Sequence, residues 1–350
     1  GADQKILYTE CCRADSFRRH GLTHKGMEKK MDSIMRKDIT YIYGVSVEKC
    51  VEIVKENFFS NEELELVERE VSCLDDFREV YSELLKYRKF EHCISKMHAV
   101  TGNESFFYQG CCAVCGTEQP FIVDYRFAEV EDGMKTPNWR ERLVCPNCGC
   151  NSRQRFIISR VFTSYKPGMK ILLYEQNSEV FRKICREIDG VTGFEYPGEN
   201  VLNSEKSGEM EYAGIFEDIC SLSYADEMFD LLVANDVFEH TVNYESAFRE
   251  ALRVLKPGGK LIFTVPFNAN SEITEKRAEE GENGLICTAK ELFHANPIPE
   301  MPPLLVCQIF GWDILETIKE CGFKRCCGKV YYGLREGYLG YLPIFFEAYK

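Results

Sequence analysis

Residues 216–266 read FEDICSLSYADEMFDLLVANDVFEHTVNYESAFREALRVLKPGGKLIFTVP, and this stretch decides the fold. The apolar run from Asp230 to Ala234 is too short for a buried helix and predicts a central strand. Tyr244 to Leu255 carries apolar residues at helical spacing, and Pro257-Gly258-Gly259 ends that helix and turns the chain. Lys260 to Val265 predicts a second buried strand. A strand, a helix, a glycine turn and a strand form one βαβ crossover of a parallel sheet, so we expect an α/β fold.

Polar side chains follow the first of these strands. Asn235, Asp236, Glu239 and His240 come directly after it. Ligands of parallel sheets bind at the carboxyl ends of the strands. The sequence therefore predicts a ligand site at this edge of the sheet.

The same stretch closely resembles the second half of the class I S-adenosylmethionine (SAM) dependent methyltransferases. The shared marks are the spacing D-x-x-x-L…F-D, which begins at Asp218, and the KPGG turn at 256–259. In that family an acidic residue in the position of Asp218, here followed by Ile219, hydrogen-bonds the adenine amino group. The resemblance implies a doubly wound, Rossmann-like, seven-stranded methyltransferase sheet over residues 161–350, with SAM as cofactor.

The first strand of this sheet should be Met169 to Tyr174, a compact apolar run. The family would continue with an acidic residue and a glycine-rich turn, but the turn here is Glu175-Gln176-Asn177-Ser178, without glycine. Asn177 tolerates a left-handed backbone better than most residues, and Ser178 can cap a helix over Glu179 to Ile188.

The second strand, residues 191–196, ends in Glu195 and Tyr196. A carboxylate only accepts hydrogen bonds, so Glu195 suits both ribose hydroxyls of the cofactor, and Tyr196 could stack on the adenine. The expected cofactor-binding residues are Glu175, Gln176, Asn177, Glu195, Tyr196, Asp218, Ile219, Asn235 and Asp236.

Cysteine spacing predicts a metal site in residues 106–160. Two CxxC pairs lie twenty-nine residues apart: Cys112 and Cys115, then Cys145 and Cys148. Each pair is followed by a glycine, as in the knuckles of a tetrahedral zinc site. A closed four-thiolate site holds a fold together rather than activating water, so we expect a structural Zn²⁺ in a zinc ribbon. Cys111 and Cys150 are spare thiols that could substitute, and an iron–sulfur cluster is a lesser alternative.

The segment after the second knuckle, residues 151–162, predicts a helix that leads from the ribbon into the sheet. The ribbon and this Arg-rich helix resemble a bacterial branch of the same methyltransferases, whose members often accompany sugar-modifying genes. Phe293-His294-Ala295-Asn296-Pro297, followed by Phe310-Gly311-Trp312-Asp313, resembles the HGNP…FGWD pattern of that branch. The resemblance covers roughly residues 110–350.

Residues 1–105 are strongly charged and predict a helical N-terminal extension. Ser60 and Glu63 form a capping-box pattern that opens a helix toward Val71. Asp75 to Lys96 carries apolar residues at helical spacing. We expect this extension to act as a cap or as a homodimer contact.

Bulk properties exclude several classes of partner. The chain of 350 residues carries a formal net charge of -13, which gives no global attraction for phosphate backbones. It has no apolar run of transmembrane length, and its first twenty residues show no signal-peptide pattern. Eighteen cysteines include adjacent pairs such as Cys326-Cys327, which argue for a reducing compartment. We therefore expect a cytoplasmic protein without a membrane partner.

The chemistry of methyl transfer suggests the catalytic candidates. In-line displacement on a sulfonium depends mainly on positioning, and a general base helps when the acceptor is a hydroxyl or a protonated amine. His240 and His294 are the candidate bases because histidine titrates near neutral pH. Glu239 could orient His240 or bind the substrate.

Three functions remain open at this point. The first is O- or N-methylation of a small molecule, a sugar or a secondary metabolite. The second is RNA methylation through the ribbon, but residues 106–160 hold seven Lys/Arg and six Asp/Glu, a net of +1 against -14 for the remainder. Phosphate contacts need concentrated positive charge, so nucleic acid ranks below a small molecule. The third, suggested by the missing glycines, is a non-catalytic binding module.

Overall fold

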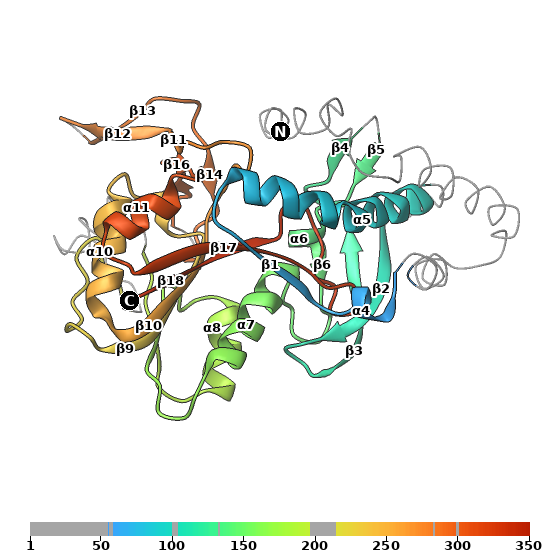
Figure 1. The fold of residues 1–350 in the computed structure, drawn as a ribbon, viewed down its shortest axis with the longest axis horizontal. Helices are drawn as coiled ribbons and strands as arrows, with labels where there is room; N and C mark the ends of the chain where they lie inside the picture. The colour runs from blue at the N-terminus through green and yellow to red at the C-terminus, as the bar shows by residue number, and fades with distance from the viewer. Residues whose placement is uncertain are drawn as a thin grey trace, which may run out of the picture.

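The computed structural model describes residues 55, 59–99, 104–131, 134–196, 215–282, 284–298 and 301–350. The expected extension over residues 1–54 lies outside this description. Figure 1 shows one central sheet with a smaller sheet beside it. No helix in the described ranges is long and apolar enough to span a membrane.

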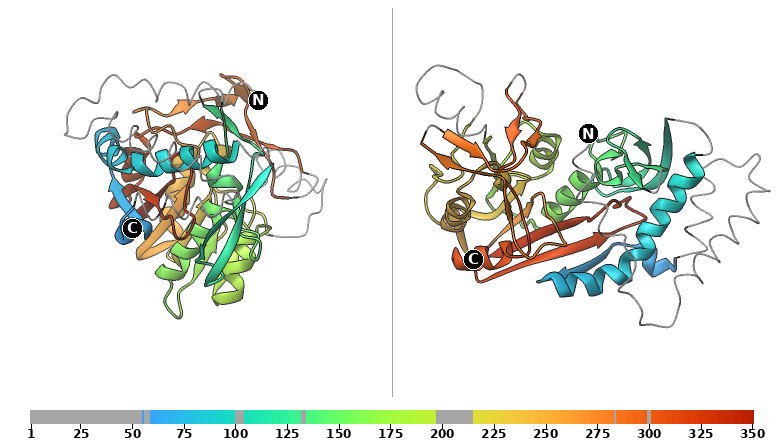
Figure 2. Two further views of the ribbon diagram at one scale, coloured as in Figure 1. Left: turned by 90° about the vertical axis from the view of Figure 1, so that its right-hand side faces the viewer. Right: turned by 90° about the horizontal axis from the view of Figure 1, so that it is seen from above.

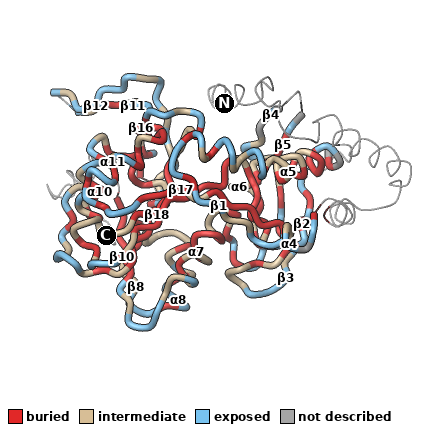
Figure 3. Tube along the Cα trace, in the orientation of Figure 1, coloured by how far each residue is buried: buried red, intermediate tan, exposed pale blue. Residues whose placement is uncertain are grey.

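The central sheet has seven strands in the order β1-β17-β18-β10-β9-β7-β8. Strands β8, β7, β9 and β10 are parallel, whereas β18, β17 and β1 are antiparallel to their neighbours. Their bounds are β1 Val67–Val71, β7 Ile171–Leu173, β8 Val191–Gly193, β9 Phe229–Asn235, β10 Leu255–Thr264, β17 Arg325–Tyr332 and β18 Ile344–Tyr349. Figure 3 shows the buried part of the chain following these strands.

Helices cover both faces of the sheet. The helices are α7 Ser152–Ser164, α8 Glu179–Glu187, α10 Tyr244–Val254 and α11 Ile314–Glu320. Helices α7 and α8 pack together, as do α10 and α11, and Figure 2 shows the two pairs on opposite sides of the sheet. This arrangement is the doubly wound α/β fold that the sequence predicts.

The predicted crossover is confirmed in detail. Strand β9, helix α10 and strand β10 occupy the expected places, and β9 and β10 pair in parallel from Lys260 with Leu231 to Thr264 with Asn235. The Lys-Pro-Gly-Gly segment makes an irregularity at the start of β10, between Leu255 and Lys260. Gly258 has a φ of 80°, a left-handed conformation that glycine adopts without strain.

The composition of the sheet differs from the expectation. The chain after β8 contributes one isolated parallel bridge, between Glu195 and Phe216, where a further strand would lie. The seventh strand, β1, comes instead from the N-terminal region and pairs with β17 in register Val67 to Tyr332. The expected helix toward Val71 is therefore wrong, because α4 ends at Leu64. Its capping box is confirmed, since Ser60 and Glu63 bond reciprocally.

Helix α5, Leu74–Ala99, confirms the long helix expected after Asp75. Its apolar face is buried within this chain; Tyr87, for example, stacks on Tyr332 of β17 with ring centroids 4.9 Å apart. The expected role of the N-terminal extension as a cap or a homodimer contact stays a prediction.

The ribbon is a separate three-stranded sheet in the order β2-β3-β6. Its elements are β2 Ser105–Cys112, β3 Thr117–Asp124, α6 Trp139–Arg142 and β6 Leu143–Val144, with a small hairpin of β4 Glu129–Glu131 and β5 Met134–Thr136. The sequence of the ribbon also predicts a strand over Glu141 to Val144. That prediction is only half right, because Glu141 and Arg142 belong to α6 and only Leu143–Val144 form β6. Helix α7 follows directly, and Asn151 caps it in a capping box with Gln154.

A segment between β10 and α11 folds over the carboxyl edge of the sheet. It contains short paired strands: β11 Glu275–Lys276 with β16 Gln308–Ile309, β12 Ala278–Gly281 with β13 Gly284–Cys287, and β14 Phe293–His294 with β15 Leu304–Leu305. The Gln308 side-chain amide donates to the carbonyls of Phe238 and Thr241, at 2.7 and 2.9 Å. The segment is thereby fixed to the short helix η1, Phe238–His240, which follows β9.

One buried carboxylate ties α7 to three strands. Glu347 of β18 is buried with its side chain 1% exposed, and it accepts from Lys260 and Lys329 at 2.8 Å each. Arg160 of α7 lies 3.5 Å away. Burial alone would raise the pKa of Glu347, but the hydrogen bonds from Lys260, Lys329 and Tyr349 outweigh it and lower the pKa to about 2.

We predict that Glu347→Gln lowers the free energy of unfolding by about 3 kcal/mol at pH 7, because three cations lose a buried partner. A carboxyl whose folded pKa is lowered stabilises the fold above its unfolded pKa, and this contribution disappears as the pH falls through the folded pKa. The difference between wild type and variant should therefore shrink between about pH 4.5 and 2. Urea unfolding at several pH values measures this, with the exposed Glu279→Gln as control. A difference that is the same at every pH would contradict the assignment.

Candidate functional site

The end of β8 is bonded to the turn after β7. The Glu195 side chain is buried, at 2% residue exposure, and its Oε1 accepts the backbone N–H groups of Gln176 and Asn177 at 2.9 and 2.7 Å. Burial raises the pKa of Glu195, against the opposing effect of these two amides. Both amides bind the same oxygen, Oε1, and the Asn177 side chain also stabilises this carboxylate.

The glycine-free turn is explained by its backbone. None of residues 175–178 has a positive φ, so the left-handed conformation expected at Asn177 is not used. Ser178 instead caps α8 by accepting from the Phe181 amide at 3.0 Å. The glycine that close packing requires lies on β8: a Cβ on Gly193 would sit 2.7 Å from the Glu175 carbonyl oxygen.

Two more predicted residues meet at the carboxyl edge. Asn235, at the end of β9, donates its side-chain amide to the Glu175 carboxylate at the end of β7. Burial raises the pKa of Glu175, although hydrogen bonds from Ser178 and Asn235 oppose the shift. The structure thus brings together Glu175, Gln176, Asn177, Glu195 and Asn235.

Asp218 lies two residues beyond Phe216, the residue that pairs with Glu195. Its Oδ1 accepts the Cys220 amide at 2.9 Å, so the acidic turn is rigidly closed. Ile219 beside it is fully buried. Tyr196 is also buried, which gives its ring little surface for stacking on an adenine. The adenine contacts of these residues stay predictions.

Asp236 has a different environment from the one expected. It adopts a left-handed φ of 53° and its Oδ2 lies 3.5 Å from Arg153 and 3.9 Å from Arg140. Burial would raise its pKa, but Arg153 and Arg140 outweigh burial and hold the pKa well below the usual range. Arg153 also bonds Glu141 at 2.9 Å. Asp236 therefore joins the ribbon and α7 to the sheet through Arg140 and Arg153. None of these contacts supports a direct role of Asp236 in cofactor binding.

Sequence reasoning missed Arg140 and Arg153 as parts of this edge. Their partner Asp236 lies more than eighty positions along the chain, so no local spacing reports the pairing. The left-handed backbone of Asp236, a conformation in which Asp is favoured among residues other than glycine, is visible only in the structure.

The candidate catalytic residues form one cluster. Oε1 of Glu239 lies 3.6 Å from His240 Nε2 and 3.3 Å from His294 Nδ1. Burial by itself lowers the pKa of His294, but the Glu239 carboxylate outweighs it and raises the pKa. His240 Nδ1 lies 2.8 Å from the Leu305 carbonyl oxygen, to which it donates. The Nδ1 of His240 is thus used on a backbone carbonyl, whereas its Nε2 faces Glu239 Oε1 at a distance too long for a hydrogen bond.

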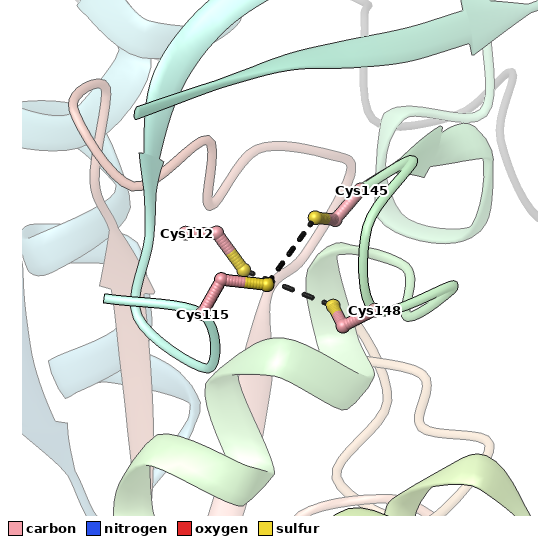
Figure 4. A group of neighbouring side chains, drawn as sticks. All are labelled: Cys112, Cys115, Cys145 and Cys148. Atoms are coloured by element: carbon pink, nitrogen blue, oxygen red, sulfur yellow. Dashed lines mark hydrogen bonds between the residues drawn. The ribbon is translucent and has the colours of Figure 1, made fainter. Parts of the chain in front are cut away.

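The four predicted cysteines converge, as Figure 4 shows. Their sulfur atoms lie within 4.8 Å of one another, with Cys112 3.8 Å from Cys148 and Cys115 3.8 Å from Cys145. Each knuckle closes with a glycine amide donating to the first cysteine carbonyl, at 2.8 and 2.9 Å. Cys150 lies outside the cluster, and its thiol donates to the Cys148 carbonyl.

The arginines of this region are committed to intramolecular contacts. Arg142 bonds Asp124 and Arg160 lies 3.2 Å from Glu68. Arg155 is fully buried and donates to the Glu336 and Gly337 carbonyls. With Arg140 and Arg153 on Asp236, all five arginines that could form a basic face for RNA in this region have partners within the chain.

Comparison with known proteins supports the fold assignment. Residues 176–263 match the model of a methyltransferase domain. That range contains the turn after β7, Glu195, Asp218 and the end of β9.

Curated relatives match over short segments. The chain is 40% identical over 67 residues to an arsenite methyltransferase of Aquipseudomonas alcaligenes, which is 19% of each chain. It is 46% identical over 55 residues to a sarcosine/dimethylglycine N-methyltransferase of Halorhodospira halochloris, which is 16% of this chain and 19% of that protein. The chain thus spans about a fifth of the length of these relatives.

Two solved structures are similar to this chain at low identity and low TM-score. A SAM-dependent methyltransferase from Mesorhizobium loti is 14% identical, covers 55% of this chain and 97% of its own, and has a TM-score of 0.33. One from Aquifex aeolicus is 15% identical, covers 55% of this chain and 87% of its own, and has a TM-score of 0.30. The similarity of this chain to a methyltransferase domain thus rests on residues 176–263.

Proposed function

We propose that this protein is a SAM-dependent methyltransferase that transfers the methyl group to oxygen or nitrogen of a small molecule, such as a sugar or a secondary metabolite. The observation that carries the proposal is the buried Glu195 carboxylate, held by two amides at the carboxyl edge within the matched domain. The substrates named for the relatives are not carried over, because those matches cover so little of either chain.

The residues at this edge fit a nucleoside cofactor. Glu195 would accept from the ribose hydroxyls through Oε2, and Asp218 would accept from the adenine amino group, since carboxylates are acceptors only. The hydrogen bond from Asn235 to Glu175 closes the bottom of the proposed cofactor site between β7 and β9. SAM, when bound, supplies an electrophilic methyl on a sulfonium, and the chain needs mainly to orient the acceptor in line with it.

The acceptor end of the site would be the Glu239, His240 and His294 cluster. It follows β9 by a few residues, and the segment of β14 to β16 covers it. Such a cover presents side chains to a bound acceptor. The carboxylate and the imidazoles of this cluster would accept the proton that a hydroxyl or an amine loses.

We also propose that the four cysteines bind a structural Zn²⁺. A tetrahedral site with Zn–S bonds of about 2.3 Å places its sulfurs about 3.8 Å apart. The two measured separations of 3.8 Å fit one ion better than an iron–sulfur cluster, whose thiolates lie further apart. The chemistry of four thiolates is structural, so no catalytic step is assigned to this ion.

The RNA alternative is weakened by the arginines. Their charges are neutralised within the chain by Asp236, Glu141, Asp124, Glu68 and Glu347 or used on carbonyls. Counterion release needs cations that are free to meet phosphates. The missing glycines no longer support the non-catalytic alternative, because no residue of the turn 175–178 has the positive φ that would require a glycine. A cytoplasmic location and the lack of nucleic-acid and membrane partners remain part of the proposal.

We predict that Glu195→Ala weakens binding of S-adenosylhomocysteine by about tenfold to a hundredfold, since each hydrogen bond to a charged group contributes about 1.5–3 kcal/mol. Calorimetric titration measures this. Glu195→Gln, which keeps an acceptor for the two amides, separates ligand binding from the order of the turn. Glu187→Ala, an exposed acid at the end of α8, is the control. Equal affinity in wild type and both Glu195 variants would refute the cofactor assignment.

We predict that Cys145→Ser reduces the zinc content from about one ion per chain to a small fraction and lowers solubility with it, because a closed four-thiolate site contributes to folding. Metal analysis of the purified proteins tests this. Cys150→Ser is the matched control, since that buried thiol lies outside the cluster. A soluble Cys145→Ser protein with full zinc would rule out the ligand set.

A further inference from the structure

The cluster of Glu239, His240 and His294 combines one buried carboxylate with two imidazoles. Glu239 is 0% exposed, and neither of its oxygens has a partner of hydrogen-bond geometry among the described residues. An ionised carboxylate that is buried without donors is strongly disfavoured unless a cation accompanies it. The buried Glu239 carboxylate therefore indicates that a positive charge lies between these side chains.

The hydrogen bond of His240 limits which kind of positive charge can lie between the three side chains. Because Nδ1 donates to the Leu305 carbonyl at 2.8 Å, Nε2 of a neutral ring carries a lone pair. That lone pair faces Oε1 of Glu239 at 3.6 Å, a repulsive arrangement unless a cation lies between them. An imidazole that donates one N–H to a backbone carbonyl is the usual form of a histidine metal ligand.

The spacing of the three donor atoms suits one metal ion. Donors that lie about 2.1 Å from a common ion are separated by about 3.0–4.2 Å. The separations of Glu239 Oε1 from the two imidazole nitrogens are 3.6 and 3.3 Å, and the three ligand atoms all lie within 4.8 Å of one another. A proton shared between Glu239 and His294 would make that contact favourable. It would still leave the lone pair on His240 Nε2 facing Glu239 without a partner.

We propose that Glu239, His240 and His294 bind a divalent first-row transition-metal ion. Two imidazoles and one carboxylate are ligands for Mn²⁺, Fe²⁺, Co²⁺ or Zn²⁺ rather than for Ca²⁺ or Mg²⁺, which prefer oxygen. Three protein ligands leave coordination positions open. His294 is the most exposed of the three, so these positions face the side from which an acceptor arrives.

This site deepens the proposed methyltransferase function, on which its role rests. An acceptor hydroxyl that coordinates the ion loses its proton to solvent more readily, because the ion lowers the pKa of a bound oxygen. The oxygen then forms a bond to the methyl carbon while the sulfur–carbon bond breaks, and that electron pair stays on sulfur as a neutral thioether. The substrate class is thereby narrowed to a hydroxyl acceptor that can coordinate a metal ion.

The site is connected to the proposed cofactor edge. Glu239 lies four positions beyond Asn235, which bonds Glu175. Asp236 between them is close enough for its charge to act on His294, and Arg153 links Asp236 electrostatically to Glu175. A metal-bound hydroxyl and the cofactor would therefore share one continuous polar edge.

Mn²⁺ titration followed by electron paramagnetic resonance tests the site on the full, zinc-replete chain without SAM. Mn²⁺ favours nitrogen and oxygen ligands over thiolates, so the cysteine cluster does not compete. We expect about one bound Mn²⁺ per chain, and a loss of affinity of at least about tenfold in Glu239→Gln and in His294→Gln. Glu280→Gln, an exposed acid on β12, should bind as wild type does.

Electron spin-echo measurements on the wild type provide a second readout that needs no variant. Modulation from imidazole nitrogen on the bound Mn²⁺ supports the site. Its absence, or no binding at millimolar Mn²⁺, overturns it. Titration of the same samples with S-adenosylhomocysteine separates the two proposals. Cofactor binding without Mn²⁺ binding refutes only the metal site, and Mn²⁺ binding without cofactor binding refutes only the methyltransferase function.

Discussion

The hydrogen bonds from two backbone amides to Glu195 are the constraint on which the rest of the site depends. They fix the turn after β7 against the end of β8, and the same residue forms the bridge to Phe216 that leads the chain to Asp218. Glycine-rich turns usually let a backbone approach a cofactor. Here the turn is ordered by a carboxylate, and the close approach is provided by Gly193 on the neighbouring strand.

The sequence predicts the crossover of β9, α10 and β10, because its apolar periodicity is local and strong. It does not predict β1, since Val67–Val71 is mostly charged and becomes a strand only by pairing with distant β17. The same reasoning places Glu175, Glu195 and Asn235 at strand ends, and the structure brings these residues together at the carboxyl edge. The pairing of Asp236 with Arg140 and Arg153 is not predicted, because these arginines lie far away in the chain and only the tertiary fold reveals them.

The ribbon is integrated into the domain rather than attached to it. Helix α7 carries Arg153 to Asp236, Arg155 to the carbonyls before β18 and Arg160 to Glu347. These contacts connect the cysteine cluster, the sheet and the carboxyl edge through a single helix.

A crystal structure of the zinc-replete protein with S-adenosylhomocysteine tests the central claim most directly. The account predicts that the ribose hydroxyls lie within hydrogen-bond distance of Glu195 Oε2, while Oε1 keeps the amides of Gln176 and Asn177. The homocysteine sulfur should point toward Glu239 and His294. A ligand bound elsewhere, or bound at this edge without contact to Glu195, would contradict the account.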